Sequence, residues 1–406
     1  MRVPEISRKT DLLRLYKNVK TYFKTIDFNK SEISSTSPPA VFVGRVGYPN
    51  INVGILAPPD KLENTWLHDA PELWSKEDYS IEKIINLRAA LLNSRFKANI
   101  KSTSKFLDIS QEVGMAYKPV NLEIDLVKKP RFSISIDKLA LPMGPSGQLK
   151  KVQITENTKI HTKVDKVHSD TDLKAAEAIN YLYKNNFDVN FLSKILSIGT
   201  IGLKSNRKLV PTRWSITATD DTIGKQLIKE IQDYPAVNEY YLYHDQYIGN
   251  HYFVLFLPDV FSYELFESYM PLNLKNQNEL LQTEHDYEYY YGRKVYAKNT
   301  VGGYYACRIG ILEKLKEIKR QATVIVFRFV TSQYTTPLGV WVCRESTRRA
   351  LNNKTLKFQT QEQLIKYLKE LILGKFNYNI ENLLNHSEIL KYINQQTKLS
   401  KWSYSQ

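Results

Sequence analysis

The chain has 406 residues, of which 42% are hydrophobic and 24% are charged. These proportions are typical of globular proteins and exclude wholesale disorder, and the length suits roughly two or three domains. No stretch approaches the roughly 20 apolar residues that span a bilayer, and the first residues lack the apolar core of a signal peptide. Cys307 and Cys343 stand far apart and encode neither a disulfide framework nor a structural zinc site. We therefore expect an intracellular, cytoplasmic protein with no membrane segment.

The balance of charge favours a polyanionic partner. The chain has 57 Lys and Arg against 42 Asp and Glu, which gives a formal net charge of +15. Nucleic acid is the leading candidate, because summed positive charge attracts phosphate backbones. The 27 tyrosines would then supply stacking surfaces for unpaired bases. The alternative is an excess of lysine on a solvated surface, with the tyrosines half-buried in the core.

The N-terminal third begins with a basic segment and continues into strands. Residues 1–30 carry apolar side chains at helical spacing among many lysines and arginines, which predicts a basic amphipathic helix. A short strand at 41–43 runs into a glycine-containing segment around Arg45, where the side chain is placed to reach an anion. A hairpin turn with an exposed arginine is the alternative. Alternating apolar residues then predict an antiparallel hairpin of strands at 120–127 and 131–136.

An acidic cluster opens the helix expected over residues 168–184. Its members are Asp170, Asp172 and Glu177. Carboxylates at this spacing suit one or two oxygen ligands to Mg²⁺, as in nuclease sites. Acids at this position also complement the helix dipole, and that interpretation is the simpler one.

The segment 209–222, LVPTRWSITATDDT, places a cation, a stacking surface and two acids close together. It follows a basic run, Lys204, Arg207 and Lys208. Alternation after Pro211 predicts a short strand, and helical spacing from Thr222 predicts a helix capped by Asp220 or Asp221. We expect Arg213 and Trp214 to contact phosphate and base. Alternatively, one acid caps the helix, the other is exposed, and Arg213 pairs with one of them.

The C-terminal half predicts a second mixture of strands and helices. A tyrosine-rich hairpin is expected over 239–257, a helix over 302–319, strands at 323–330 and 337–346, and a capped helix at 360–373. Strands that come in hairpin pairs predict an α+β fold, with a mixed sheet packed against helices and a flexible C-terminal tail. The Asn- and Gln-rich stretch 272–283 suggests a boundary. The expected regions are 1–275, 283–385 and a tail at 394–406.

Several long blocks resemble the archaeal Nre family of DNA repair proteins. They are FVGRVGYPN at 42–50, DAPELW at 69–74, PMGPSG at 142–147, VDKVHSDTDLKAAEA at 164–178, LVPTRWSITATDDTI at 209–223, GRK at 292–294, VGGYYACR at 301–308 and PLGVWVCRE at 337–345. The resemblance implies a role in DNA damage repair alongside the sliding clamp PCNA, which such proteins contact through a short C-terminal motif. It implies a pathway rather than a reaction. Many family members carry a cysteine-rich, zinc-finger-like element near the N-terminus, and this chain has no cysteine there, so zinc is not expected.

The tail carries that motif. Gln396, Leu399 and Trp402 have the spacing of a PCNA-interacting peptide, in which two apolar side chains project from one helical turn and the glutamine enters a polar pocket. A second aromatic is usual where Ser403 stands, which predicts modest affinity unless Tyr404 substitutes.

Two hypotheses about function follow. The first is a nucleoid-associated repair factor that binds DNA through Arg45, Arg213, Trp214 and the basic run, and is recruited by PCNA. The second is a metal-dependent nuclease or nucleotide-processing enzyme in the same pathway, with Mg²⁺ or a general base supplied by the candidate catalytic acids, which are Asp170, Asp172, Glu177, Asp220 and Asp221. The second requires the acids to converge in one cleft.

Overall fold

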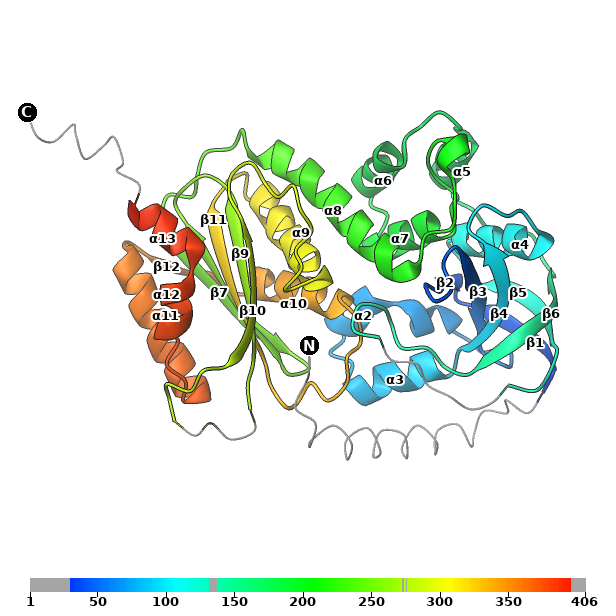
Figure 1. Cartoon of the computed structure of the whole chain (residues 1–406), viewed down its shortest axis with the longest axis horizontal. Coiled ribbons are helices and arrows are strands. Elements are labelled where there is room, and N and C mark those ends of the chain that lie inside the picture. The colour runs from blue at the N-terminus through cyan, green and yellow to red at the C-terminus, as the bar shows by residue number, and fades with distance from the viewer. Residues whose placement is uncertain (1–29, 131–136, 272–273, 275, 396–406) are drawn as a thin grey trace, which may run out of the picture. The chain divides into compact units, whose positions relative to one another are not determined.

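The computed structural model describes residues 30–130, 137–271, 274 and 276–395. The expected strand at 131–136 and the tail motif at 396–402 lie outside these ranges, as does nearly all of the expected N-terminal helix. Two compact units divide the chain: Met1–Ile223 with Thr335–Val342, and Gly224–Tyr334 with Cys343–Gln406. Each unit contains one six-stranded sheet with helices packed on it (Figure 1), which confirms the predicted α+β class.

The sheet of the first unit has the order β1-β5-β6-β4-β3-β2. Its strands are antiparallel except for β4 and β6, which pair in parallel. The bounds are β1 Glu32–Ser37, β2 Ala40–Val43, β3 Asn50–Ala57, β4 Leu92–Asn99, β5 Val120–Leu126 and β6 Ser146–Ile154. The predicted strands at 41–43 and 120–127 are therefore confirmed. Their alternating apolar residues form one core with side chains such as Val113 of α4 and Ile198 after α7.

Four helices of the first unit, α3, α4, α5 and α7, begin at side-chain caps. Ser80 accepts from the backbone N–H of Lys83 at the start of α3, and Asp188 accepts from Asn190 and Phe191 at the start of α7. The bounds are η2 Thr65–Asp69, α2 Pro71–Lys76, α3 Ile81–Ala89, α4 Lys105–Met115, α5 Thr162–Ser169, α6 Ala175–Lys184, α7 Val189–Ser197 and η3 Lys204–Asn206.

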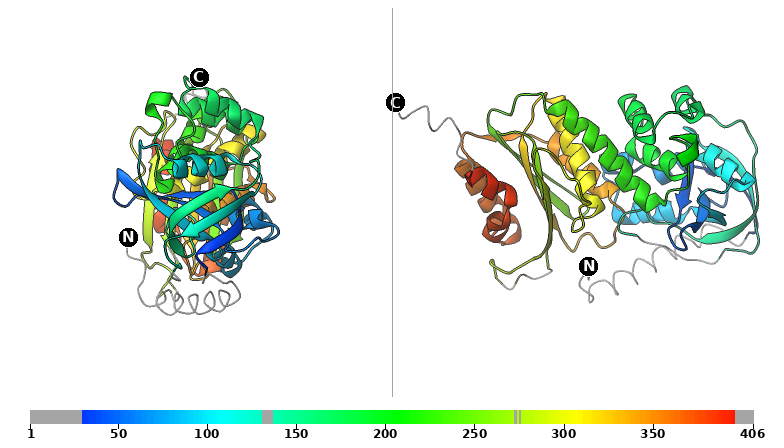
Figure 2. Two further views of the ribbon diagram at one scale, coloured as in Figure 1. Left: turned by 90° about the vertical axis from the view of Figure 1, so that its right-hand side faces the viewer. Right: turned by 45° about the horizontal axis from the view of Figure 1, so that its top comes forward.

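The sheet of the second unit is covered on both faces. Its order is β10-β9-β11-β8-β7-β12, with β9 and β11 parallel and the other pairs antiparallel. The bounds are β7 Tyr240–Tyr247, β8 Asn250–Leu257, β9 Ser262–Tyr269, β10 Gln282–Glu288, β11 Thr323–Val330 and β12 Leu356–Phe358. Helices α11 to α13 cover one face, and α9 and α10 lie on the other (Figures 1 and 2). Every residue of β8 and β11 is buried, which explains their nearly continuous apolar sequences.

The predicted hairpin at 239–257, helix at 302–319 and capped helix at 360–373 are confirmed. In the last of these, Thr360 accepts from Gln363 N–H and the Gln363 side chain accepts from Gln359 N–H. Residues after it form two further short helices on the same face of the sheet. The bounds are α9 Gly302–Glu317, α10 Trp341–Asn352, α11 Gln361–Phe376, α12 Glu381–His386 and α13 Glu388–Gln395. No helix of the described residues is long and apolar enough to cross a membrane.

The strand predicted after Pro211 is wrong, because the segment is the start of α8, Thr212–Ile231. The buried face carries polar residues in its first half, Ser215, Thr219 and Asp220, before it continues with Ile223. The apolar alternation that suggested a strand therefore does not mark the buried side. Asp220 and Asp221 stand in the middle of α8, so neither caps a helix.

The strand predicted at 337–346 is also wrong, because α10 occupies this segment. Gly339 has φ of +104°, a left-handed conformation that favours glycine, immediately before the helix. Nearly every side chain from Leu338 to Thr347 is buried. The buried residues include the polar side chains of Arg344, Glu345, Ser346 and Thr347, so polarity does not mark an exposed face in this segment. The short apolar alternation before them was therefore misinterpreted as a strand.

The helix predicted over 168–184 is in fact two helices. Helix α5 ends at Ser169 and α6 begins at Ala175. The Asp170 carboxylate accepts from the backbone N–H groups of Asp172 and Leu173, at 3.1 and 3.0 Å, and so closes the turn between the helices. Asp170 thus stabilises a turn and does not lie inside a helix.

A buried histidine in β8 makes the fold sensitive to acid. His251 is 8% exposed, its Nδ1 has no hydrogen-bond partner among the described residues, and its ring meets the edge of Phe376. Burial and the positive charge of Lys375 lower the pKa of His251 from 6.5 to about 4, although the negative charge of Asp245 acts to raise it. The unfolded chain therefore takes up the proton first, and stability is lost as the pH falls from about 6.5 to about 4.

We predict that His251→Gln reduces this loss. Thermal unfolding measured from pH 7 to pH 4 should show a flatter dependence for the variant than for the unmodified protein. The same substitution at His386, whose ring is exposed on α12, is the control. An unchanged slope for His251→Gln would contradict the assignment.

Candidate nucleic-acid interface

The segment around Arg45 is the turn of the β2–β3 hairpin. Gly44 N–H donates to Asn52 O at 2.7 Å, Asn50 N–H donates to Gly47 O at 2.8 Å, and Gly47 has φ of +84°. The turn leaves Arg45 exposed, together with Val46 at 82% and Tyr48 at 44%. The alternative interpretation of this segment, a hairpin with an exposed arginine, is thus the conformation observed.

The hairpin turn lies beside the first turn of α8. Val43 N–H donates to Thr212 Oγ1 at 2.9 Å, and the rings of Tyr48 and Trp214 meet with centroids 5.3 Å apart. Trp214 remains 46% exposed. Two segments that are far apart in the sequence, and that were expected to act together, therefore form one surface with cationic and aromatic side chains. We call Arg45, Val46, Tyr48, Arg213 and Trp214 the hairpin–helix surface.

Arg213 pairs with an acid that sequence analysis did not consider. Its Nη1 lies 3.4 Å from Asp137 Oδ2, and both side chains are about one third exposed, at 30% and 31%. An ion pair in this setting is screened by water and stabilises the fold weakly. The expectation that Arg213 pairs with Asp220 or Asp221 is wrong.

The five candidate catalytic acids have separate environments. Asp170 closes the α5–α6 turn, and Asp172 and Glu177 are exposed near it. Asp220 is completely buried in α8, and Asp221 is partly buried. Within the described ranges, no three His, Cys, Asp or Glu side chains are close enough together to hold a metal ion. The convergence that the nuclease hypothesis requires is not found among these residues.

The basic run lies against the acidic turn. The Arg207 guanidinium donates to the carbonyl oxygens of Gly202 and Asp170, at 2.8 and 2.9 Å, and Lys204 N–H donates to Thr171 O. Burial lowers the pKa of Arg207, and the Asp170 carboxylate opposes that shift. Arg207 therefore joins two loops, whereas Lys204 and Lys208 are exposed.

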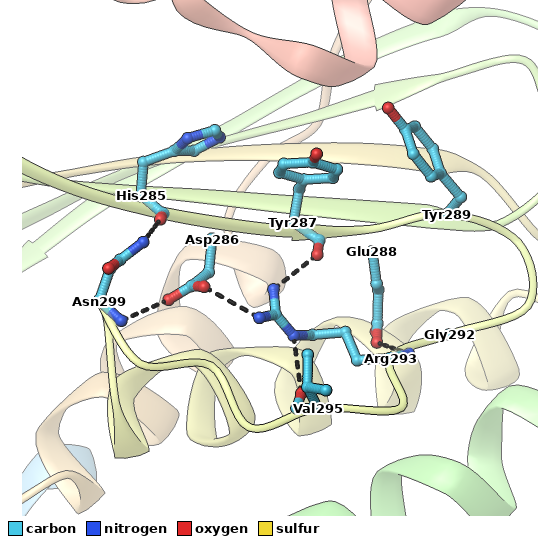
Figure 3. A pocket seen from close by; sticks show the side chains of 9 residues that line it. All are labelled: His285, Asp286, Tyr287, Glu288, Tyr289, Gly292, Arg293, Val295 and Asn299. Carbon is cyan, nitrogen blue, oxygen red and sulfur yellow. Dashed lines mark hydrogen bonds and ion pairs between the residues drawn. The ribbon is translucent and has the colours of Figure 1, made fainter.

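The second unit contains a cavity of about 380 Å³ at the end of β10 (Figure 3). Successive β10 side chains point to opposite sides: His285, Tyr287 and Tyr289 to one, and Asp286 and Glu288 to the other. The lining residues are His285, Asp286, Tyr287, Glu288, Tyr289, Gly292, Arg293, Val295 and Asn299.

Two ion pairs fix the loop that follows β10. Arg293 Nη2 lies 3.1 Å from Asp286 Oδ1, and its backbone N–H donates to Glu288 Oε2 at 3.1 Å. Arg308 of α9 donates to both oxygens of Glu288, at 3.1 and 2.9 Å, and the two side chains are 1% and 0% exposed. Tyr304 packs beside both arginines, and burial raises its pKa well above 10.0. The loop is therefore held by charges that are removed from water.

Sequence analysis did not select these residues as a site. Asp286 and Glu288 alternate with tyrosines in a strand, a pattern that indicates exposed acids rather than buried ones. The partial signal was the GRK block at 292–294, which carried part of the family resemblance. The two cysteines, which are far apart in the sequence, are close in the structure: Cys307 Sγ lies 3.9 Å from the Cys343 carbonyl oxygen.

Comparison with known proteins identifies the family. The family model described as Archaeal Nre, N-terminal, matches residues 7–276, and the model described as Archaeal Nre, C-terminal, matches residues 288–402. The chain belongs to the archaeal Nre family. The resemblance inferred from the sequence blocks is thus confirmed.

Relatives in this family align over most of their length. DNA repair protein NreB of Archaeoglobus fulgidus is 34% identical over 367 residues, which cover 90% of this chain and 91% of the relative. DNA repair protein NreA of Haloferax volcanii is 35% identical, covering 82% of this chain and 81% of the relative. DNA repair protein NreA of Archaeoglobus fulgidus is 37% identical, covering 87% of each. No solved structure matches this chain.

We predict that the Arg308 and Glu288 charges are strongly coupled. Glu288→Gln keeps an acceptor for Arg293 N–H but removes the negative charge from the buried Arg308–Glu288 ion pair, which should cost roughly 3–5 kcal/mol. Combining Glu288→Gln with Arg308→Met removes both charges and should cost less than Glu288→Gln alone. Thermal and urea unfolding of the two single variants and the double variant give the coupling energy. Additive losses would contradict the prediction.

Proposed function

We propose that this protein is a DNA repair factor that binds DNA and is recruited to the PCNA sliding clamp through its C-terminal motif. The observation that carries the repair role is the alignment, over four fifths or more of both chains, with relatives named as DNA repair proteins. Those names describe the relatives. We propose the same role for this chain because it belongs to their family.

Three features of the hairpin–helix surface support DNA binding. Arg45 and Arg213 are cations on neighbouring segments, and Tyr48 and Trp214 expose aromatic faces on which unpaired bases stack. The first turn of α8 contains no acid, so the partial positive charge at the helix start adds to that of the arginines. The formal net charge of +15 favours the encounter with a phosphate backbone.

We predict that Arg45→Ala with Arg213→Ala weakens DNA binding and lowers its salt dependence. Each lost phosphate contact should reduce the slope of log affinity against log salt by about 0.7–0.9. Trp214→Ala should weaken binding to single-stranded DNA by roughly tenfold through lost stacking. Both effects can be measured by fluorescence anisotropy at several salt concentrations.

The controls come from the same unit. Trp66 is 46% exposed, like Trp214, and Arg95 is exposed on β4. Trp66→Ala and Arg95→Ala should leave the affinity and the salt slope nearly unchanged. If the Arg45, Arg213 and Trp214 variants bind DNA as tightly as the unmodified protein, the hairpin–helix surface is not the DNA contact.

The chemistry of the tail supports recruitment to the clamp. The last eleven residues, QTKLSKWSYSQ, contain no acid and too few apolar groups to form a core of their own. Leu399 and Trp402 are three residues apart in the sequence, a spacing that would let both serve as apolar anchors on one helical turn, and Gln396 would supply an amide for a polar pocket. Lys398 and Lys401 would speed encounter with an acidic partner surface.

Deleting residues 396–406 is expected to remove clamp binding without lowering the melting temperature. The reason is that the proposed anchors would contact the clamp and would not stabilise this protein's own core. The triple variant Gln396→Ala, Leu399→Ala and Trp402→Ala should behave in the same way. Isothermal titration calorimetry against purified clamp measures the loss. Thr397→Ala with Ser400→Ala, at positions that the motif does not specify, is the matched control. Unchanged affinity in the triple variant would refute the motif.

A further inference from the structure

The loop after β10 presents tyrosines and lysines on the surface of the second unit. Tyr291 is 91% exposed, Val295 70%, Tyr296 44% and Tyr289 37%. Lys294 and Lys298 are exposed between and beyond them. We call residues 289–298, YYYGRKVYAK, the tyrosine–lysine loop, and its sequence contains no acid. The hypotheses drawn from the sequence did not use this surface.

The exposed rings are supported from within the unit. The Arg293 guanidinium donates to the carbonyl oxygens of Tyr287, Val295 and Tyr296, at 2.7, 3.2 and 3.4 Å. The Tyr296 ring stacks on Tyr305 with centroids 5.5 Å apart, and Tyr305 itself is 4% exposed. These contacts fix the loop backbone, so a ligand that bound there would not have to order it.

Further contacts hold the two ends of the loop. Gln232 Nε2 of the second unit donates to Tyr290 O at 3.2 Å, and the Ala297 N–H donates to the Tyr305 hydroxyl at 2.9 Å. Asp286 Oδ2 accepts from the backbone N–H groups of Asn299 and Thr300, at 3.0 and 2.8 Å. The first end of the tyrosine–lysine loop is therefore held by the half-buried Gln232, and the last end is held by the buried Tyr305 and Asp286.

The charge at this surface is positive because the nearby acids are paired. Asp286 and Glu288 point inward (Figure 3) and are matched by Arg293 and Arg308. Glu388 of α13 and Glu264 of β9, two acids near Tyr289, pair with Lys391 at 2.8 Å and with His285 at 2.6 Å. The loop itself contains no acid and exposes Lys294 and Lys298, so its charge is complementary to an anion.

From these contacts we infer that the tyrosine–lysine loop is a binding site for single-stranded DNA. Exposed aromatic faces that alternate with cations match a strand whose bases are unpaired and whose phosphates lie beside them. A duplex keeps its bases stacked internally and offers no free face to tyrosine. The cavity of about 380 Å³ next to the loop, lined by Tyr289 and Val295, is within the volume range of ligand pockets and would accept one unstacked base. The inference rests on the proposed DNA-binding function and assigns the second unit a contact of its own.

The test compares two loop variants of the full chain. Tyr291→Ala with Tyr296→Ala should weaken binding of a fluorescein-labelled dT20 by about tenfold per tyrosine, and should change binding of a hairpin duplex little. Lys294→Gln with Lys298→Gln should lower the slope of log affinity against log salt by about 1.4, since each phosphate contact on a single strand contributes roughly 0.7. Anisotropy titrations at several salt concentrations measure both effects.

Tyr367→Ala with Lys366→Gln supplies the matched control. Both residues are exposed on α11 of the same unit, and Tyr367 is 39% exposed. This variant should bind dT20 like the unmodified protein. Thermal unfolding of every variant shows whether weaker binding comes from a lost contact or from a destabilised fold. Tyr291→Ala alone should leave the melting temperature nearly unchanged, because its ring is 91% exposed.

The outcomes distinguish this inference from the proposal it rests on. If the unmodified protein binds neither single-stranded nor duplex DNA, the proposed function fails and the inference fails with it. If the protein binds dT20 and the loop variants bind it equally well, the proposed function stands and the loop inference is overturned. If the loop variants keep their affinity for dT20 but no longer bind the clamp, the surface is a protein contact and the inference is overturned. If they lose affinity only for an rU20 oligonucleotide, the surface is an RNA contact and the inference is likewise overturned.

Discussion

Charged groups can leave water at tolerable cost when an opposite charge and hydrogen bonds replace the water, and the second unit depends on that constraint. Arg308 and Glu288 are almost completely buried together, and Arg328 pairs with Glu267 and with Asn250 inside the same sheet. Each guanidinium links elements that are distant in the sequence, so the pairs fix where α9, β10 and the loop after it lie. Removing one partner of such a pair would take away part of the electrostatic compensation for the buried charge of the other, and so would lower the stability of the fold.

The same constraint determines which side chains remain for a ligand. In the loop after β10, the acids are used internally and the lysines and tyrosines are left outside. In the first unit, the β2–β3 hairpin and the start of α8 are joined by a hydrogen bond from the Val43 N–H to the Thr212 hydroxyl and by a pair of aromatic rings. Arg45 and part of Trp214 stay in solvent. Both surfaces combine an exposed ring with a nearby cation, a combination that suits unpaired nucleic acid better than a compact small molecule.

Burial also explains the acids that drew attention in the sequence. Asp170 uses its carboxylate to close a turn that Arg207 holds from the other side, and Asp220 occupies the buried side of a long helix. Their spacing along the chain resembled that of metal ligands, but the spacing arises from a turn and a helix face. The environments of these carboxylates differ too much for them to act as one set of ligands.

The sequence by itself determined the elements whose burial follows a simple period. The hairpin at 240–257, the strands at 120–126 and 323–330, and the helix begun by Thr360 follow from alternation, caps and turns, which are local properties. The mixture of hairpins and helices predicted the α+β class, and the long sequence blocks, such as LVPTRWSITATDDTI at 209–223, indicated the family.

Only the tertiary structure decided the parts that depend on neighbours distant in the chain. The first half of α8 buries serine, threonine and aspartate, and α10 buries arginine, glutamate, serine and threonine, so in these segments the buried residues are not the apolar ones. The partners of Arg213, Arg293 and Arg308 are likewise set by packing, because a charge pairs with whatever the fold brings within a few ångströms. Local periodicity reports which face of an element is apolar, but the groups that a buried polar side chain meets are fixed when the elements pack together.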